Sequence, residues 1–338
     1  MTNPCPACGE AIGLDDGFCE ACGAELAPAA VSSGAAGGAR ECPLCAAAGR
    51  ASAGVSPEGY CEICGRKVPS GRDREELDVG LVAGVTDRGL RHARNEDAMA
   101  LAATRVSGGP VALAVVCDGV SSAPRADEAS LSAVRAAAGS LLSAVRAGDD
   151  PAAASDAAVR AAGRAVGALG GPAGAPATTY ASAVVDGAGV TVCWIGDSRV
   201  YWLAADGSGS RCLTTDDSLA EELVGAGRAT VAEAMASPQA HVITRWLGAD
   251  LPEPEPHVAR FEPPDEGVVL LCSDGLWNYQ PGATELAAMA LPAALTDPLA
   301  AAAALVRFAV DAGGADNITT VIMPFPPAWP ENSPRSER

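Results

Sequence analysis

Four Cys-x-x-Cys pairs lie before residue 65, and their spacing predicts metal binding: Cys5/Cys8, Cys19/Cys22, Cys42/Cys45 and Cys61/Cys64. The two thiolates of one pair can face the same ion, and two pairs separated by 10 or 15 residues supply a tetrahedral site that suits Zn²⁺. Redox chemistry at one such pair requires a βαβ scaffold, whereas this segment is rich in Gly and Ala.

The same segment has almost no large apolar side chains, so a bound metal must supply its folding free energy. The sequence therefore predicts two structural Zn²⁺ ions in two zinc ribbons, at residues 1–26 and 41–68, with a flexible linker at 27–40 between them. A second, charged linker is expected at residues 69–76. The remaining cysteines lie inside apolar runs and are expected to be buried thiols.

Four aspartates adjoin apolar runs farther along the chain. Asp118 closes VALAVVCDG, Asp274 closes VVLLCSDG, Asp197 interrupts VCWIGDSRVYW, and Asp316 precedes ITTVIM. Any single Asp-Gly is better explained as the cap of a turn, but four acids with this placement weaken that explanation. Carboxylates at buried strand ends repel one another and lose hydration unless cations lie among them. Their oxygen ligands predict Mg²⁺ or Mn²⁺.

The elements that must position these acids are short strands and long helices between about residues 77 and 325. Two helices are indicated by apolar residues at helical spacing, from Leu131 to Val145 and from Val159 to Val166. Strands in runs and helices in pairs predict mixed layers with antiparallel sheets. The expected strands are Gly80 to Val85, Val111 to Cys117, Tyr180 to Val185, Val190 to Ile195, Val200 to Leu203, Val268 to Cys272 and Ile318 to Met323.

Composition excludes several classes of function. The chain of 338 residues has 23 Lys plus Arg against 42 Asp plus Glu, a net charge of −19. Phosphate backbones and anionic lipids repel such a protein, so no nucleic acid or membrane partner is expected. We find no secretory signal and no apolar run of the ~20 residues that a membrane span needs, which predicts a cytoplasmic protein. The Pro-rich residues 326–338 are expected to be a disordered tail.

An ordered set of motifs resembles the metal-dependent type 2C Ser/Thr protein phosphatases, in their bacterial version. The motifs span about 245 residues and are TDRGLRHARNEDAM, VVCDGV, ATTYA, CWIGDSRVYWL, LTTDDSL, HVITRWLG, LLCSDGLW and GGADNITTVIM. The resemblance implies an α+β fold, a four-layer α-β-β-α sandwich of two antiparallel sheets flanked by helices, over residues 77–325. It also implies a centre of two Mn²⁺ or Mg²⁺ ions, with a third, weaker one possible.

Residue roles follow from the resemblance. Asp118 would be the catalytic bridge between two metals, with the Gly119 carbonyl completing one site. Asp274 and Asp316 would bind the second metal, while Glu96 and Asp97 would act mainly through coordinated waters. Asp197 would hold the third metal together with Asp274. The implied reaction is in-line attack of a metal-activated water on a phosphoryl group.

Three departures from the family pattern bear on activity. The Arg that holds the substrate phosphate, four residues before the motif Glu, is replaced by His92, with Arg91 and Arg94 beside it. Either His92, which is charged only part of the time near neutrality, or Arg91 is expected to bind the phosphate. The usual DGxGG reads DGVSS, with Ser121 and Ser122, and the usual DHS contains Asp217 in place of His.

The sequence therefore predicts an enzyme that hydrolyses phosphoserine or phosphothreonine in proteins that Ser/Thr kinases modify, with the zinc ribbons as a docking or regulatory module for a protein partner. Two alternatives stay open at this stage. The first is a catalytically weak scaffold that binds phosphoproteins, which the altered phosphate-binding motif favours and the intact acid set disfavours. The second is an adaptor in which the ribbons dominate.

Overall fold

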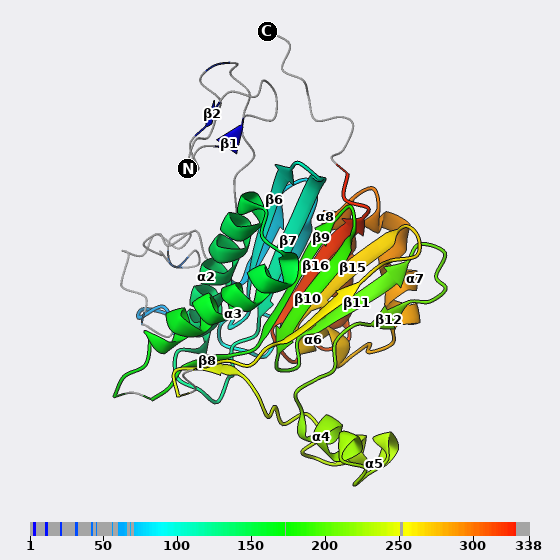
Figure 1. Cartoon of the computed structure of the whole chain (residues 1–338). Helices are drawn as coiled ribbons and strands as arrows, with labels where there is room; N and C mark the ends of the chain where they lie inside the picture. Colours follow the sequence, from blue (N-terminus) through cyan, green and yellow to red (C-terminus); the bar gives the residue numbers. More distant parts are fainter. Residues whose placement is uncertain are drawn as a thin grey trace.

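Two antiparallel sheets packed face to face form the centre of the molecule, and helices cover both outer faces (Figure 1). The computed structural model describes residues 71–172, 174–250 and 253–328 and, before them, residues 3–4, 11–12, 21, 31–32, 42, 45, 56, 60–65 and 68. The predicted tail is described only as far as residue 328. Among the described residues, no helix combines the length and the apolar character that crossing a membrane requires.

The first sheet has the strand order β14-β10-β9-β7-β6-β3, and neighbouring strands are antiparallel. Its strands are β3 (Val31–Ser32), β6 (Ala98–Val106), β7 (Gly109–Cys117), β9 (Tyr180–Asp186), β10 (Gly189–Ile195) and β14 (His257–Phe261). The short edge strand β3 lies inside the stretch expected to be a flexible linker, and it pairs with β6 through Val31 and Leu101. That linker is therefore not wholly free of the sheet.

The second sheet has the order β12-β11-β15-β16-β5-β4, again antiparallel throughout. Its strands are β4 (Arg74–Asp78), β5 (Ala83–Asp87), β11 (Arg199–Ala204), β12 (Arg211–Cys212), β15 (Gly267–Cys272) and β16 (Ile318–Phe325). Two small pairings accompany the sheets, between β1 (Asn3–Pro4) and β2 (Ala11–Ile12) and between β8 (Ala177–Thr178) and β13 (Leu247–Gly248). β16, the last strand among the residues that the structure describes, lies in the interior of its sheet, between β15 and β5.

Three apolar cores separate the four layers. The first lies between the first sheet and the helices α2 (Ala126–Ala147) and α3 (Pro151–Gly167). The second joins the facing sides of the two sheets. The third lies between the second sheet and the helices α7 (Ala283–Ala294) and α8 (Pro298–Asp311) (Figure 1). The α-β-β-α sandwich is thus confirmed, and both helices indicated by apolar spacing are present.

The strands were harder to predict where alternation between apolar and polar residues is missing. β6 reads AMALAATRV and was not expected, because both of its faces are buried and its alanines suit a helix equally well. In β6, Ala98 and Ala100 contact the first core while Met99 and Leu101 contact the second. β14 was also missed; its residues alternate between half-buried and exposed.

The first strand of the second sheet corrects one predicted boundary. β4 begins at Arg74, inside the expected linker at residues 69–76, and pairs with β5 along its length. Its sequence, REELD, is highly charged. Charged side chains are common in edge strands because they disfavour pairing with other chains. The sandwich therefore begins three residues earlier than residue 77.

A small helical segment projects from the end of the sandwich (Figure 1). It contains α4 (Leu219–Gly225) and α5 (Val231–Met235), which meet through a few small apolar residues including Ala220 and Ala234. Thr230 begins α5 with a reciprocal capping box to Glu233. One further short helix, α6 (Asp274–Trp277), follows β15 directly.

Candidate metal centre

The predicted acids come together at one end of the sandwich because each adjoins the end of a strand. Glu96 and Asp97 precede β6, Asp118 follows β7, and Asp197 lies in the turn between β10 and β11. Two more lie on the second sheet: Asp274 begins α6 directly after β15, and Asp316 precedes β16. Both sheets thus deliver carboxylates to one place.

Burial, and then mutual repulsion, raise the pKa values of these carboxylates. Burial raises the pKa of Asp118 well above its ordinary value, and the charges of Asp97, Asp274, Asp197 and Asp316 raise it further. Burial, followed by hydrogen bonds that act in the opposite direction and by the charge of Asp316, leaves the pKa of Asp97 at about 7. Burial and then Asp316 raise the pKa of Asp274 to about 7. For Asp197, burial and then Asp274 raise the pKa well above the ordinary value.

Buried hydroxyl groups hold one oxygen of Asp97, while the other has no hydrogen-bond partner in the described part of the chain. Ser273 Oγ and Thr319 Oγ1 donate hydrogen bonds of 2.7 Å and 2.8 Å to Asp97 Oδ2. Thr319 in turn meets Thr86 Oγ1 at 2.7 Å, and Asn95 Nδ2 donates to Thr86 at 2.9 Å. These supporting residues were not singled out from the sequence, since their contacts depend on the pairing of β5 with β16.

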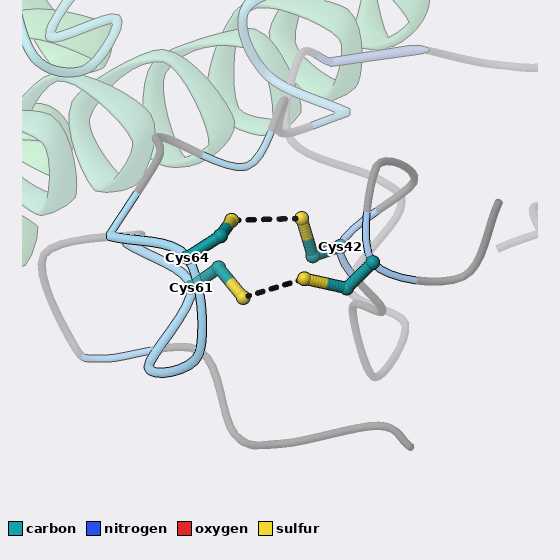
Figure 2. A group of neighbouring side chains, drawn as sticks. Cys42, Cys61 and Cys64 are labelled. Atoms are coloured by element: carbon teal, nitrogen blue, oxygen red, sulfur yellow. Dashed lines mark hydrogen bonds between the residues drawn. The ribbon is translucent and has the colours of Figure 1, made fainter. Parts of the chain in front are cut away.

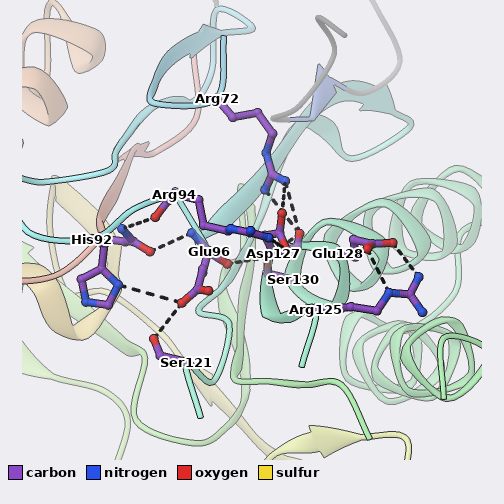
Figure 3. A network of polar contacts seen from close by, with 10 residues as sticks. Arg72, His92, Arg94, Glu96, Ser121, Arg125, Asp127, Glu128 and Ser130 are labelled. Carbon is purple, nitrogen blue, oxygen red and sulfur yellow. Dashed lines mark hydrogen bonds and ion pairs between the residues drawn. The ribbon is translucent and has the colours of Figure 1, made fainter. Parts of the chain in front are cut away.

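The backbone of Glu96 is held on both sides. Its N–H donates to Asn317 Oδ1 at 2.7 Å, and its carbonyl accepts from Ser130 Oγ at 2.5 Å and from the Gly119 N–H at 3.2 Å. Its carboxylate accepts a hydrogen bond of 2.8 Å from Ser121 Oγ (Figure 3). The serine that replaces a family glycine therefore contributes a new contact to a predicted metal ligand.

Close approach of the backbone at two glycines brings the loops of the centre together. A Cβ at Gly119 would lie 2.7 Å from the Glu96 carbonyl oxygen, and one at Gly275 would lie 1.9 Å from the Asn317 carbonyl oxygen. A side chain at either position would push the acid-bearing loops apart. The Asp118 carbonyl is fixed by the N–H of Thr179 at 2.8 Å, which holds the same loop from the other side.

His92 lies at the rim of the acid cluster. Its Nε2 is 3.2 Å from Asp316 Oδ1 and its Nδ1 is 3.9 Å from Glu96 Oε2, and 27% of the side chain is exposed. Arg91 is an exposed residue. Of the two residues considered for phosphate binding, His92 is thus the one that the structure places against the predicted metal ligands.

Asp217, which replaces the family histidine, also has well-defined partners. Its Oδ2 accepts from the Gly196 N–H at 2.9 Å, beside Asp197, and its Oδ1 lies 2.8 Å from His257 Nε2. His257 comes from β14 and stacks on Trp194, with ring centroids 4.9 Å apart. An imidazole is therefore present near this turn although the DHS motif lacks one.

The ligand atoms of the acid cluster fit divalent ions that prefer oxygen. Asp97 Oδ1 and Asp274 Oδ1 are buried carboxylate oxygens without a hydrogen-bond partner among the described residues. An unpaired buried carboxylate oxygen is unfavourable unless a cation binds it. Carboxylate and carbonyl oxygens without thiolates favour Mg²⁺ or Mn²⁺.

A second candidate metal site lies in the N-terminal part. The sulfurs of Cys42, Cys45, Cys61 and Cys64 all lie within 4.8 Å of one another, with 3.7 Å between Cys42 and Cys64 and between Cys45 and Cys61 (Figure 2). A tetrahedron with metal–sulfur bonds of about 2.3 Å has sulfur–sulfur edges of about 3.8 Å, so the four thiols match a zinc site.

Two thiols of this cluster differ in acidity. A hydrogen bond with the backbone of Cys64 contributes most to lowering the pKa of Cys61 to about 7, whereas burial raises that of Cys45 to about 12. The other predicted zinc ligands, Cys5, Cys8, Cys19 and Cys22, lie outside the described residues.

Known proteins are similar to most of this chain. A family model described as protein phosphatase 2C matches residues 88–307. The serine/threonine protein phosphatase PstP of Mycobacterium tuberculosis is 33% identical over 243 residues, which cover 71% of this chain and 44% of that protein. Protein phosphatase PhpP of Streptococcus pneumoniae is 37% identical over 142 residues, 42% of this chain and 54% of that protein. The chain spans about half the length of these curated relatives.

Solved structures share the fold. The phosphatase MsPP of Mycobacterium smegmatis, crystallised with cacodylate, superposes with a TM-score of 0.56 at 31% identity, covering 72% of this chain and 97% of that one. The catalytic domain of PstP in complex with two manganese ions gives a TM-score of 0.51 at 31% identity, covering 71% and 96%. The family model covers more than half of this chain, and the sandwich superposes on a solved phosphatase structure. This chain therefore belongs to the protein phosphatase 2C family.

Proposed function

We propose that the sandwich hydrolyses phosphoserine and phosphothreonine in proteins, with Mn²⁺ or Mg²⁺ in the acid-lined centre. One observation carries the proposal: acids from both sheets converge, and two of their buried oxygens have no hydrogen-bond partner among the described residues. When bound, two such ions would acidify a water molecule and neutralise the phosphoryl oxygens that it attacks. Membership of the protein phosphatase 2C family supports the same reaction.

Each acid takes the part that its position in the centre supports. Asp118 would bridge the two ions, because the charges of four other acids raise its pKa, more than for any other acid of the centre. Asp274 and Asp316 would complete one ion site, and the Gly119 carbonyl the other. Glu96 and Asp97 would act through waters, which suits Asp97 because one of its oxygens is already engaged by two hydroxyl groups. Asp197 would hold a third, weaker ion with Asp274.

His92 would hold the substrate phosphate. It adjoins Glu96 and Asp316 and retains 27% exposure, so an incoming phosphate can reach the imidazole beside the predicted ions. A protonated imidazole donates a charge-assisted hydrogen bond to a phosphate oxygen. Arg91 is exposed and would have to turn inward to do the same.

The N-terminal cysteines would hold two structural Zn²⁺ ions. Sulfur distances within the second group of four support one of them, and the matching spacing of Cys5, Cys8, Cys19 and Cys22 supports the other. The ribbons would serve as a docking or regulatory module for a protein partner.

The decisive test is hydrolysis of p-nitrophenyl phosphate and of a phosphothreonine peptide by the purified full chain. We expect activity with Mn²⁺ or Mg²⁺, none after chelation, and recovery when metal returns. As a control, Asp206→Asn removes a carboxylate from an exposed turn and should leave turnover unchanged. Phosphopeptide binding without turnover would instead favour a phosphoprotein-binding scaffold.

A further inference from the structure

The second cysteine cluster consists of Cys42, Cys45, Cys61 and Cys64. A charged segment lies between this cluster and the sandwich in the sequence. Val68 is 2% exposed and packs with Cys42, Cys45 and Cys61, so the cluster reaches at least this far along the chain. Only three residues separate Val68 from Arg72, which already contacts α2. The segment Arg72–Arg74, called the charged link below, therefore contacts the sandwich and begins four residues after Val68 of the cysteine cluster.

Every residue of the charged link is fixed to the sandwich. Both terminal nitrogens of Arg72 donate to the Asp127 carbonyl, at 3.4 Å and 3.3 Å, and its Nη1 lies 3.6 Å from the Asp127 carboxylate. The Asp73 carbonyl accepts from the N–H of Arg88 at 2.7 Å. Arg74 donates to Asp87 at 3.0 Å. Arg72 and Asp127 are largely shielded from water, with side-chain exposures of 18% and 20%, so solvent screens their contact less than a surface pair.

Asp127 lies two contacts away from a predicted metal ligand. It belongs to the first turn of α2, and its carboxylate also pairs with Arg94 at 3.4 Å. One turn later, Ser130 donates to the Asp127 carbonyl at 3.3 Å and to the Glu96 carbonyl at 2.5 Å (Figure 3). The loop that carries Glu96 is thus held against the first turn of α2, which the charged link holds from the other side.

We propose that Arg72 and Asp127 are positioning residues for Glu96, and that through them the second cysteine cluster and the acid-lined centre bind their metals cooperatively. This inference rests on the proposed function, because it requires both metals. Zinc would order the segment that ends at Val68 and so present Arg72 in its bonded position. Without zinc, forming the Arg72–Asp127 contact costs the entropy of ordering that segment.

Cooperativity of this kind is reciprocal by thermodynamic necessity. If zinc at the cysteines tightens Mn²⁺ binding by some factor, Mn²⁺ must tighten zinc binding by the same factor. Contacts of this type, a partly buried ion pair and a few hydrogen bonds, support a factor of roughly three to ten.

The test is calorimetric titration of Mn²⁺ into the full chain, compared between the zinc-loaded protein and a Cys61→Ser/Cys64→Ser variant. We expect the variant, Arg72→Gln and Asp127→Asn each to weaken Mn²⁺ binding by roughly threefold to tenfold. Arg72→Gln added to the cysteine variant should weaken it no further, because the charged link is already released. Release of zinc to a colorimetric chelator should also be slower when Mn²⁺ is present.

Glu128→Gln provides the matched control for Asp127→Asn. Glu128 lies in the same first turn of α2, but its partner is Arg125, which Figure 3 shows on the side of the helix away from Arg72. Both substitutions remove one negative charge from the same helix end, but only Asp127→Asn removes the carboxylate that pairs with Arg72 and Arg94, and Arg72→Gln then separates the charged link from Arg94. Hydrogen exchange of residues 88–97 gives a second readout, and we expect faster exchange in Asp127→Asn than in Glu128→Gln.

The outcomes separate this inference from the proposed function. If both metals bind but the Mn²⁺ constant is the same with and without zinc, or if Glu128→Gln weakens binding as much as Asp127→Asn, the coupling is refuted and the phosphatase proposal stands. If the chain binds no Mn²⁺, both proposals fail. If it binds Mn²⁺ but no zinc, the ribbons and the coupling fail together.

Discussion

The hydroxyl group of Ser121 donates a hydrogen bond of 2.8 Å to Oε2 of Glu96, at a position where the family motif has glycine. Glycine has no side-chain donor, so this chain holds the Glu96 carboxylate by a contact that the motif itself does not provide. The added hydroxyl restrains a side chain that the proposal assigns to metal-bound water. Ser121 is therefore the place where a departure from the family pattern can be tested most directly.

Substitution of Ser121 by Ala or Gly should weaken Mn²⁺ activation. A hydrogen bond to a charged group contributes about 1.5 to 3 kcal/mol, and exposure of Ser121 places the effect at the lower end, so we expect a loss of about tenfold in apparent Mn²⁺ affinity. The dependence of the initial rate on Mn²⁺ concentration measures it. Ser122→Ala, at the adjacent exposed serine, should behave as the wild type. Equal effects at both serines would argue against the hydrogen bond as the cause.

Asp118→Asn should have opposite effects on activity and on stability. It removes the proposed bridge, so turnover should fall to background. It also removes a buried acid that four other acids repel, so the metal-free protein should become more stable, by about 1 to 2 kcal/mol. Denaturant unfolding in the presence of a chelator measures the second effect. A destabilised, metal-free Asp118→Asn would show that the repulsion is relieved in some other way.

Stability of the metal-free protein should fall as the pH rises from about 5 to about 8. Burial and neighbouring charge hold the pKa of Asp97 and Asp274 at about 7, whereas an unfolded aspartate has a pKa of about 3.9. Over this range the folded state binds protons that the unfolded state has released, so raising the pH favours unfolding. Mn²⁺ should remove this slope because it replaces the protons. Thermal unfolding in chelator and in Mn²⁺, at several pH values, would reveal it; a metal-free midpoint that rises with pH would contradict the prediction.

His92→Ala should lower kcat/KM by roughly 10- to 150-fold, the size expected for a lost charge-assisted hydrogen bond. His92→Arg should retain most of the activity, because a guanidinium can donate two parallel hydrogen bonds to a phosphate. Steady-state rates for the wild type and both variants provide the measurement. Arg91→Ala serves as the comparison: should it carry the large loss while both His92 variants match the wild type, Arg91 holds the phosphate.

Cys5→Ser combined with Cys8→Ser should reduce the zinc content from two ions per chain to one. The cluster formed by Cys42, Cys45, Cys61 and Cys64 contains neither residue, so its ion should stay bound. Elemental analysis of protein purified under reducing conditions gives the count. A loss of both ions would indicate that the eight cysteines form a single cooperative unit.

The acid centre was predictable because its residues adjoin strands whose apolar runs are plain in the sequence. Asp118 and Asp274 follow such runs. In an antiparallel sheet the end of one strand lies beside the start of its neighbour, so residues that adjoin strands gather at the same end of the sheet. The hydroxyl network around Asp97 was not predictable in this way. Thr86 and Thr319 are 233 residues apart, and only the register between β5 and β16 brings them into contact.

Strands with unusual burial limited the prediction of the fold. β7 reads GPVALAVVC and was recognised by its valines, but its partner β6 is built largely of alanines. Burial on both faces removes the polar alternation that marks a strand, and alanine favours helices in isolation. Pairing with β7, and at two residues with β3, decides the conformation of β6, and pairing is a property of the assembled sheet.

The place of β16 in its sheet has a consequence for synthesis of the protein. β16 is the last strand in the described part of the chain, yet it lies between β15 and β5, and Asp316 lies two residues before its first residue. Until a ribosome has made β16, its two neighbours in the sheet, β15 and β5, each have an unpaired edge. Before Asp316 is made, the acid cluster also lacks a member. The acid cluster is therefore incomplete until residues 316–325 have been made, and a chain that stopped before Asp316 would expose two interior strand edges to association with other chains.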